Sequence, residues 1–395
     1  MTQLQDTDVV IVEAVRSPLG KRNGGLSTMH PADLLGAVQT EVVARAGIDP
    51  ATLGQVVAGC VTAIGEQTYD IGRTSWLAAG LPLEVPATTV DVQCGSSQQA
   101  FNLAAALVKG GVVDSAVACG VESMSRVPIG SATKGDFGRP IPKTYYPHYE
   151  MTSQFEGAER IAEKYGITRE HCDRFGLASQ TRAARAWDEG RFEREVLGIN
   201  APNLGDDGRP DGTTHRVDRD EGLRATTLEG LRALKPIARD DGVHTAGSSS
   251  QITDGAAALI LMTVARAKEL GVTPRARVVD QCLVGVDPVL MLEGPIDATR
   301  VLFERTGITM EDIDTTEINE AFASVVLGWA AVHEPDLEKV NPNGGAIALG
   351  HPLGGTGARL VTSALHELER SDGTLGLITM CCGGGVGTGT IIERV

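Results

Sequence analysis

The chain has 395 residues, enough for two or three domains and a large buried core, and its 42% hydrophobic and 22% charged residues are typical of a globular protein. With 35 basic and 51 acidic residues its net charge is −16, which argues against a protein that binds nucleic acid through a basic surface. The odd count of seven cysteines argues against a disulfide framework, and a polar start with only short apolar runs predicts a cytoplasmic protein without a membrane partner.

In the first third of the chain, short β-branched runs alternate with amphipathic helical patterns. Pro31 and Gly47 fit the beginning and the end of the first helix. Such alternation predicts an α/β fold with a mainly parallel sheet covered on both faces. We expect strands at 8–15, 55–58, 87–92 and 114–118, and helices at 31–46 and 94–109.

The middle of the chain is richer in charge, proline and aromatic residues. It predicts an inserted loop domain over 125–250 that contains a helix at 168–189. The apolar run 255–265 then resumes the core, and we expect it to form a buried helix. The expected domains are therefore 1–124 plus 251–274, the insert 125–250, and 275–395.

The last third repeats the first in outline. A strand within 311–318 leads into Asn319 and a helix to about 332, and a glycine-rich loop over 341–357 precedes a helix at 358–369 and a strand at 374–380. The succession of helix, turn, strand and glycine occurs from Cys94 to Gly120 and again from Gly354 to Gly383. This weak self-similarity predicts two related halves with one site at their junction.

Three reactive side chains stand at turns of this pattern. Cys94 follows a strand and begins a helix, where free amides favour a thiolate, although most free cysteines are simply small buried hydrophobes. His351 lies in the glycine-rich loop, where it could reach a substrate or serve as a cap, and a Cys–His pair is the usual way to activate a thiol. Cys381 and Cys382 run into glycines, which also fits a tight turn. For Cys60, Cys119, Cys172 and Cys282 we prefer the buried role.

Other chemical motifs are missing from the sequence. It contains no G-x-G-x-x-G, no phosphate-binding G-x-x-x-x-G-K-[ST], no C-x-x-C, no H-E-x-x-H and no G-x-S-x-G. We therefore expect no metal site.

Taken together, the motifs resemble those of the thiolase family along nearly the whole chain. Cys94-Gly95-Ser96 is similar to the segment around the family's acylated cysteine, and Cys381-Cys382-Gly383 to its second, Cys-x-Gly segment. Three further segments agree in order and spacing: Gly120 to Ser125, the Asn-Glu-Ala-Phe box from Asn319, and the segment from Gly350 to Gly357 that contains His351.

The resemblance implies a role for five residues. Cys94 would take the acyl group of a 3-oxoacyl-CoA, His351 would accept its proton, and Cys381 would exchange a proton with the acetyl-CoA carbanion. His351 and a water held by Asn319 would stabilise the enolate, and the amides of Cys94 and Gly383 the tetrahedral intermediate. Two cysteines with opposite duties need pKa values that are pushed apart.

Coenzyme A is implied as a co-substrate, with no tightly bound cofactor. The resemblance puts Ser250 in the loop before the buried run and Arg224 near the nucleotide, although Arg224 could equally be a solvated surface charge. The implied partners are acyl-CoA and CoA. The expected contacts are Arg224, Ala246, Ser250, Ala321 and Phe322.

The fold implied by the resemblance has two related βαβαβαββ halves packed as a five-layered α-β-α-β-α core, with an inserted loop domain, in a homodimer or homotetramer. The implied reaction is cleavage of 3-oxoacyl-CoA by CoA to acetyl-CoA or propionyl-CoA in fatty-acid or steroid side-chain β-oxidation. Alternatives are a biosynthetic acetoacetyl-CoA-forming acetyltransferase, a thioester hydrolase or a non-enzymatic subunit.

Three positions bear on the substrate and on related enzymes. Ser97 stands where many relatives have glycine, and Ser153-Gln154-Phe155 stands where short-chain enzymes carry His-Met-Gly. This departure favours degradative enzymes over strict acetoacetyl-CoA specificity. Asn319 separates the chain from the decarboxylative condensing enzymes of the same fold, which have a second histidine there.

Overall fold

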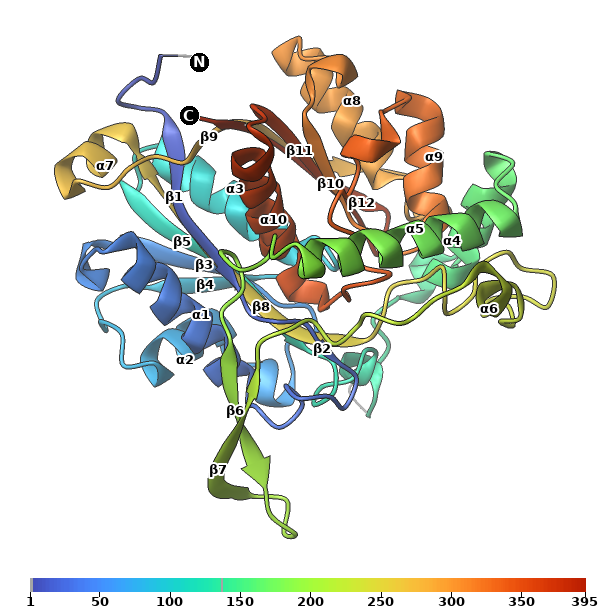
Figure 1. Ribbon diagram of the computed structural model, residues 1–395, viewed down its shortest axis with the longest axis horizontal. Coiled ribbons are helices and arrows are strands. Elements are labelled where there is room, and N and C mark those ends of the chain that lie inside the picture. The colour runs from blue at the N-terminus through green and yellow to red at the C-terminus, as the bar shows by residue number, and fades with distance from the viewer. Residues whose placement is uncertain (1–2, 136–137) are drawn as a thin grey trace.

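The computed structural model describes residues 3–135 and 138–395, and its core consists of two halves with the same order of elements (Figure 1). The first half ends in a strand that follows a long insertion. Its elements are β1 (Val9–Arg16), β2 (Gly20–Lys21), α1 (Pro31–Ala46), β3 (Gln55–Gly59), α2 (Ile71–Ala78), β4 (Ala87–Val90), α3 (Ser96–Lys109), β5 (Ser115–Ser123) and β8 (Thr253–Thr263).

The second half repeats this order, but its third strand is reduced to a single bridge between Thr316 and Val340. Helix α7 (Val264–Leu270) connects the halves. The elements are β9 (Ala276–Gly285), α8 (Gly294–Thr306), β10 (Thr315–Ile318), α9 (Ala323–His333), α10 (Thr356–Ser371), β11 (Leu375–Cys382) and β12 (Val386–Arg394).

The strands pair in the order β10-β11-β12-β9-β1-β8-β5-β3-β4, with β2 added beside β8. The two halves meet where β1 and β9 share only two residue pairs. The expectation of a mainly parallel sheet is wrong: β3 pairs in parallel with β4 and β5, and β10 with β11, whereas the other pairs are antiparallel. The reason is that β8 returns antiparallel after the insertion and that β11 and β12 form a hairpin.

Three hydrophobic clusters separate the layers. Along β1, Val10 and Val12 pack with α1 and α2, whereas Val9 and Ile11 face α3 and α10, as the period of two in a strand requires. The cluster around α3 and α10 also includes Ile378 from the second half, and a third cluster buries α8 and α9 on the outer face of that half. The result is the five-layered α-β-α-β-α arrangement that the resemblance implies.

The sequence predicts the helices of the core closely. Helix α1 begins and ends as expected: the Ala32 amide donates to the His30 side chain, Pro31 occupies the first turn, and Gly47 ends the helix at φ 66°. Two expectations are wrong. The run 255–265 forms strand β8 for most of its length, because its β-branched and small residues pair on both sides with β1 and β5. Helix α3 begins at Ser96, so Cys94 lies in the preceding turn.

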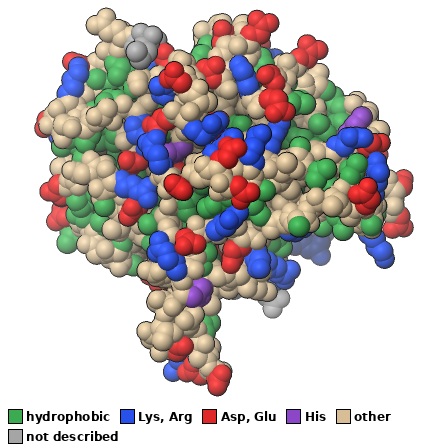
Figure 2. Space-filling model, in the orientation of Figure 1, with side chains coloured by type: hydrophobic (Ala, Val, Ile, Leu, Met, Phe, Trp, Pro, Cys, Tyr) green, Lys and Arg blue, Asp and Glu red, His purple; other side chains and the backbone are tan. Residues whose placement is uncertain are grey.

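In its described part, the insertion between β5 and β8 contains three α-helices and a hairpin. Helix α4 packs on α9 through Ala158, Ile161 and Val325, and the hairpin projects from the body (Figure 1). Acidic and basic side chains are interspersed over the face seen in Figure 2. The domain boundaries stay a prediction. The helices and strands of the insertion are α4 (Gln154–Lys164), α5 (Arg169–Asp188), β6 (Ile199–Leu204), β7 (Pro210–Val217) and α6 (Leu228–Arg232).

Within residues 3–135 and 138–395, no helix combines the length and the apolar character needed to cross a bilayer.

Candidate active site

A cavity of about 210 Å³ lies where the two halves and the insertion meet. Loops from both halves supply its reactive groups, and its apolar wall is shared between the insertion, the loop before β8 and loops of the second half. The cavity brings together six of the expected site residues: Cys94, His351, Gly383, Ser250, Ala321 and Phe322. The other lining residues are Met124, Ile129, Gln154, Phe155, Ser249, Gln251, Ile252, Leu292 and Leu353.

Cys94 sits in a tight turn between β4 and α3. The preceding Gln93 has φ 50°, and the Gly95 amide donates to the Val92 carbonyl, so the turn presents the thiol at the end of the helix. Burial raises the pKa of the Cys94 thiol to about 11 and outweighs the backbone amides of Gly383 and of Cys94 itself, which lower it. The amides therefore act in the expected direction, but burial exceeds their effect and Cys94 rests as a thiol.

His351 is fixed on both sides. Its amide donates to Thr253 Oγ1 at 3.0 Å, and its ring Nδ1 lies 2.6 Å from Thr356 Oγ1. The Thr356 hydroxyl hydrogen is committed to the Pro352 carbonyl at 2.7 Å, so its oxygen accepts from Nδ1–H. Nε2 is then the unprotonated nitrogen. Burial, followed by the charge of Arg359, lowers the pKa of His351 to about 3, so the imidazole is neutral.

Asn319 follows directly after β10 and lies beside this ring. Its Nδ2 is 3.4 Å from His351 Nε2, and its backbone amide donates to the Thr379 carbonyl of β11. Its buried Oδ1 has no hydrogen-bond partner among the residues that the structure describes. Asn319 can therefore offer an additional polar contact next to the imidazole.

Cys381 is buried near the end of β11, behind the cavity wall. It packs in one cluster with Leu292, Ala321 and Phe322. Burial, together with the nearby thiols of Cys94 and Cys382, raises the pKa of Cys381 well above its usual value. Cys94 and Cys381 are thus both held as thiols, and a group so placed is suited to giving a proton to a carbanion.

The loop 245–250 runs beside the cavity and is tied to the start of α9. The Ser250 amide donates to the Ala321 carbonyl at 2.9 Å, and Ser249 bridges to Phe322. The Phe322 ring meets the Phe155 ring edge-on, with centroids 5.5 Å apart. These contacts pack the loop 245–250 against Ala321 and Phe322, which line the cavity.

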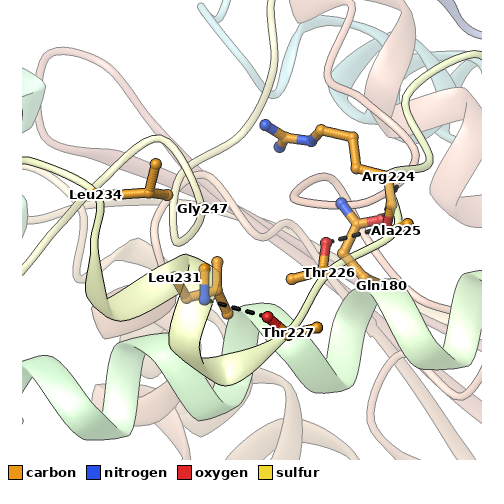
Figure 3. Close-up of a pocket in the computed structure, with 9 residues that line it drawn as sticks. Gln180, Arg224, Ala225, Thr226, Thr227, Leu231, Leu234 and Gly247 are labelled. Carbon is orange, nitrogen blue, oxygen red and sulfur yellow. Dashed lines mark hydrogen bonds between the residues drawn. The ribbon is translucent and has the colours of Figure 1, made fainter.

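The loop 245–250 also contributes Gly247 to a second pocket, which is shown in Figure 3. Arg224 extends over one side and Leu234 stands opposite, with Thr227 and Leu231 beneath. The guanidinium donates to the Ala246 carbonyl at 3.4 Å, and within the described part of the chain it has no acidic partner within 4.0 Å. The remaining lining residues are Gln180, Ala225, Thr226, Gly230 and Gly247.

Several residues that hold this site have no role among the sequence-based expectations. Glu320 lies in the Asn-Glu-Ala-Phe box and Thr356 in the segment from Gly350 to Gly357, so the family motifs could have pointed to both residues. The partners of their side chains, however, depend on the fold. Thr253 and Leu292 lie outside every motif, and nothing in the sequence singled them out.

The described residues contain no group of three or more histidine, cysteine, aspartate or glutamate side chains that could hold a metal ion.

Comparisons with known proteins agree along the chain. The family model of the thiolase N-terminal domain matches residues 9–265, and that of the thiolase C-terminal domain matches residues 272–394. A steroid 3-ketoacyl-CoA thiolase, FadA6, of Mycobacterium tuberculosis is 47% identical over 98% of this chain and 95% of its own. A beta-ketoadipyl-CoA thiolase of Escherichia coli is 41% identical over 98% of this chain and 100% of its own.

Solved structures give the same result. The Bacillus anthracis acetyl-CoA acetyltransferase has a TM-score of 0.89 at 37% identity, covering 98% of this chain and 99% of that one. The human mitochondrial 3-ketoacyl-CoA thiolase has a TM-score of 0.88 at 32% identity with the same coverage.

Proposed function

This chain belongs to the thiolase family, and we propose that it cleaves 3-oxoacyl-CoA with CoA through an acyl-Cys94 intermediate. The observation that carries the mechanism is the set of groups around the Cys94 sulfur. The backbone amides of Cys94 and Gly383 favour its thiolate form, and the neutral imidazole of His351, held in one orientation by Thr356, lines the same cavity.

In the first half-reaction Cys94 attacks the 3-oxo carbon. Because burial raises the Cys94 pKa to about 11 and lowers that of His351 to about 3, the resting pair is neutral. The proton therefore passes from sulfur to Nε2 during the attack rather than before it. The amides of Cys94 and Gly383 then stabilise the oxyanion at the former carbonyl.

The bond between C2 and C3 breaks next, and its electron pair moves to C2 as the acetyl-CoA enolate. Nε2–H of His351, with Asn319 3.4 Å away, donates to the thioester oxygen of that enolate. The Cys381 thiol gives its proton to C2, which releases acetyl-CoA and leaves the acyl group on Cys94. Loss of one oxyanion donor typically costs about 10²–10³ in rate.

In the second half-reaction an incoming CoA thiol loses its proton to the Cys381 thiolate and attacks the acyl-Cys94 carbonyl. The tetrahedral intermediate uses the same two amides. Its collapse breaks the carbon–sulfur bond to Cys94 and releases the shortened acyl-CoA. The cysteine thiolate recovers its proton from His351, so the cycle closes with every group restored.

Coenzyme A would lie along the loop 245–250. Gly247 lines the pocket of Figure 3, whereas Ser249 and Ser250 line the cavity, so one loop joins the two spaces. The exposed guanidinium of Arg224 would meet the nucleotide phosphates, and the pantetheine arm would pass Ser250, Ala246 and Phe322. Coenzyme A remains a co-substrate in this scheme, with no tightly bound group.

The proposed reaction runs in the degradative direction, as cleavage of a 3-oxoacyl-CoA. The relatives at 47% and 41% identity carry the names of thiolases that act on 3-ketoacyl-CoA and beta-ketoadipyl-CoA. Gln154 and Phe155 line the cavity, and the resemblance puts them where short-chain enzymes carry His-Met-Gly. A 3-oxoacyl-CoA of fatty-acid or steroid side-chain β-oxidation is thus the proposed substrate class.

A homodimer or larger assembly would cover the edge strand β4. This strand ends the sheet, and the nearby Leu77 and Leu83 are 45% and 69% exposed. An open edge beside apolar side chains favours pairing with a second copy. Light scattering after size-exclusion chromatography distinguishes monomer, dimer and tetramer.

The test is a thiolysis panel from acetoacetyl-CoA to bulky ring-bearing 3-oxoacyl thioesters, with products separated by chromatography. We expect CoA-dependent formation of acetyl-CoA or propionyl-CoA and a shortened acyl-CoA, abolished by Cys94→Ala. Release of free acid, or turnover that survives Cys94→Ala, would refute the proposal. Activity confined to condensation of acetyl-CoA would identify a biosynthetic enzyme instead.

A further inference from the structure

The segment 345–355, here called the histidine loop, carries His351 but has no regular secondary structure before Leu353. Loops of this kind have to be held by side chains, because a displacement of about 1 Å at a catalytic group can cost 10²-fold in rate. We propose that two buried carboxylates, Glu122 and Glu320, are positioning residues that clamp the histidine loop from the two halves of the core. The inference rests on the proposed function of His351.

Glu320 holds the loop from the second half. One carboxylate oxygen accepts from the Ile347 amide at 3.1 Å and from the Ser179 hydroxyl at 2.7 Å, and the other accepts from Asn341 Nδ2 at 2.9 Å. The Ser179 oxygen in turn accepts from the Gly345 amide at 3.2 Å. Because Glu320 directly follows Asn319, one peptide unit links the amide beside the imidazole to the anchor of the loop.

Asn341 completes this side. Its Oδ1 accepts from the Ile318 amide, and its Nδ2 also donates to the Ile318 carbonyl, both at 2.9 Å. The end of β10 is therefore fixed to the start of the glycine-rich segment. The positions of Asn319 and of the histidine loop are coupled through Glu320.

Glu122 holds the loop from the first half, three residues beyond the histidine. One oxygen accepts from the amides of Gly354 and Val61, both at 2.9 Å, and the other from the Thr62 amide at 3.0 Å and Gln67 Nε2 at 2.8 Å. Four donors converge on one carboxylate, three of them backbone amides and one a side-chain amide. Glu122 thus joins the end of β5, the loop after β3 and the histidine loop.

Both contacts require close approach of the backbone. A Cβ at Gly345 would lie 2.2 Å from the Glu320 carboxyl carbon, and one at Gly354 would lie 2.8 Å from Glu122 Oε2. The glycines on each side of His351 therefore match the two carboxylates. Both carboxylates are almost fully buried, with 0% and 1% exposure for Glu122 and Glu320. Burying a carboxylate is costly unless it is hydrogen-bonded, and donors reach both oxygens of Glu122 and of Glu320.

The test compares Glu122→Gln and Glu320→Gln with Glu195→Gln. Glu195 is equally buried but pairs with Arg16 and makes no bond to the histidine loop, so its variant measures the effect of losing a buried carboxylate elsewhere. A glutamine at either clamp position turns an NH₂ group toward amide donors, which opens the loop. Ser179→Ala is a milder change that removes one donor to Glu320.

We expect kcat for thiolysis to fall by about tenfold or more in both clamp variants, with KM for CoA within about twofold of the wild type. Amide hydrogen exchange in peptides covering 345–355 rises in these variants and not in Glu195→Gln. For Ser179→Ala we expect a smaller fall in kcat and the same local rise in exchange.

The clamp is refuted if kcat and exchange in the clamp variants match those of Glu195→Gln. Should the glutamine variants not fold, unchanged kcat and exchange in Ser179→Ala refute it. If the wild type shows no thiolysis at all, the proposed function fails, but the exchange measurement still decides whether the carboxylates hold the loop.

Discussion

Thr356 offers a sharp test of how the imidazole is oriented. Its oxygen accepts from His351 Nδ1–H at 2.6 Å, and Thr356→Val keeps the shape but removes this acceptor. Leaving a buried N–H without a partner costs about 1–3 kcal/mol, and each 1.36 kcal/mol is a tenfold change in rate. If the whole cost falls on the transition state, kcat drops by roughly 5- to 150-fold. A switch of the ring to the other tautomer would add to the loss, because Nε2 could then no longer accept the Cys94 proton.

The matched control is Thr362→Val. Thr362 lies on the same helix and is fully buried, and its hydroxyl donates to the Ala358 carbonyl as that of Thr356 donates to Pro352. The assay is steady-state thiolysis of one 3-oxoacyl-CoA at saturating CoA, with thermal unfolding recorded for each variant. Thr356→Ser should retain activity because it keeps the hydroxyl. Equal kcat for Thr356→Val and Thr362→Val would refute the proposed tautomer.

Three further predictions concern pH dependence and the binding of coenzyme A. Because the Cys94 pKa is raised to about 11 by burial, the rate of its alkylation by iodoacetamide in the free enzyme should keep rising from pH 7 to pH 9; a plateau below pH 8 would contradict a resting thiol. Arg224→Ala should raise KM for CoA by about tenfold with kcat nearly unchanged, since the guanidinium meets only the nucleotide end; an unchanged KM would return Arg224 to a surface role. Burial raises the pKa of Glu317 to about 8, so the stability that its protonated form contributes is present below about pH 4.5 and is lost as pH rises through about 8. In denaturant titrations, the free energy of unfolding of the wild type relative to Glu317→Gln should therefore fall from pH 5 to pH 8. A difference that stays constant over this range would contradict the prediction.

Local patterns predicted the helices and the family. Helix α1 has the expected bounds because Pro31 and Gly47 are local signals that tertiary contacts do not override. The convergence of Cys94, His351 and Gly383 on one cavity follows from the repeated order of elements, since equivalent loops of two related halves meet at their junction. The thiolase family and its fold are confirmed by the comparisons.

Other features depend on contacts between distant segments. The run 255–265 is apolar throughout, and only pairing on both edges makes it a strand rather than a helix. The pKa of Cys94 could not be inferred from its place before a helix, because burial exceeds the effect of the helix amides. The contact of Thr356 with His351 and that of Glu122 with Gly354 arise only when the chain is folded, so the sequence could not show them. The assembly state, the domain boundaries and a cytoplasmic location stay predictions.

The most direct measurement of the central claim is the mass of the Cys94 peptide after rapid quenching. The enzyme is mixed with a 3-oxoacyl-CoA in the absence of free CoA, digested and analysed by mass spectrometry. The mechanism predicts about one shortened acyl group per active site on Cys94, removed when CoA is added before the quench. An unmodified Cys94 during turnover, or an acyl group on another cysteine, would contradict it.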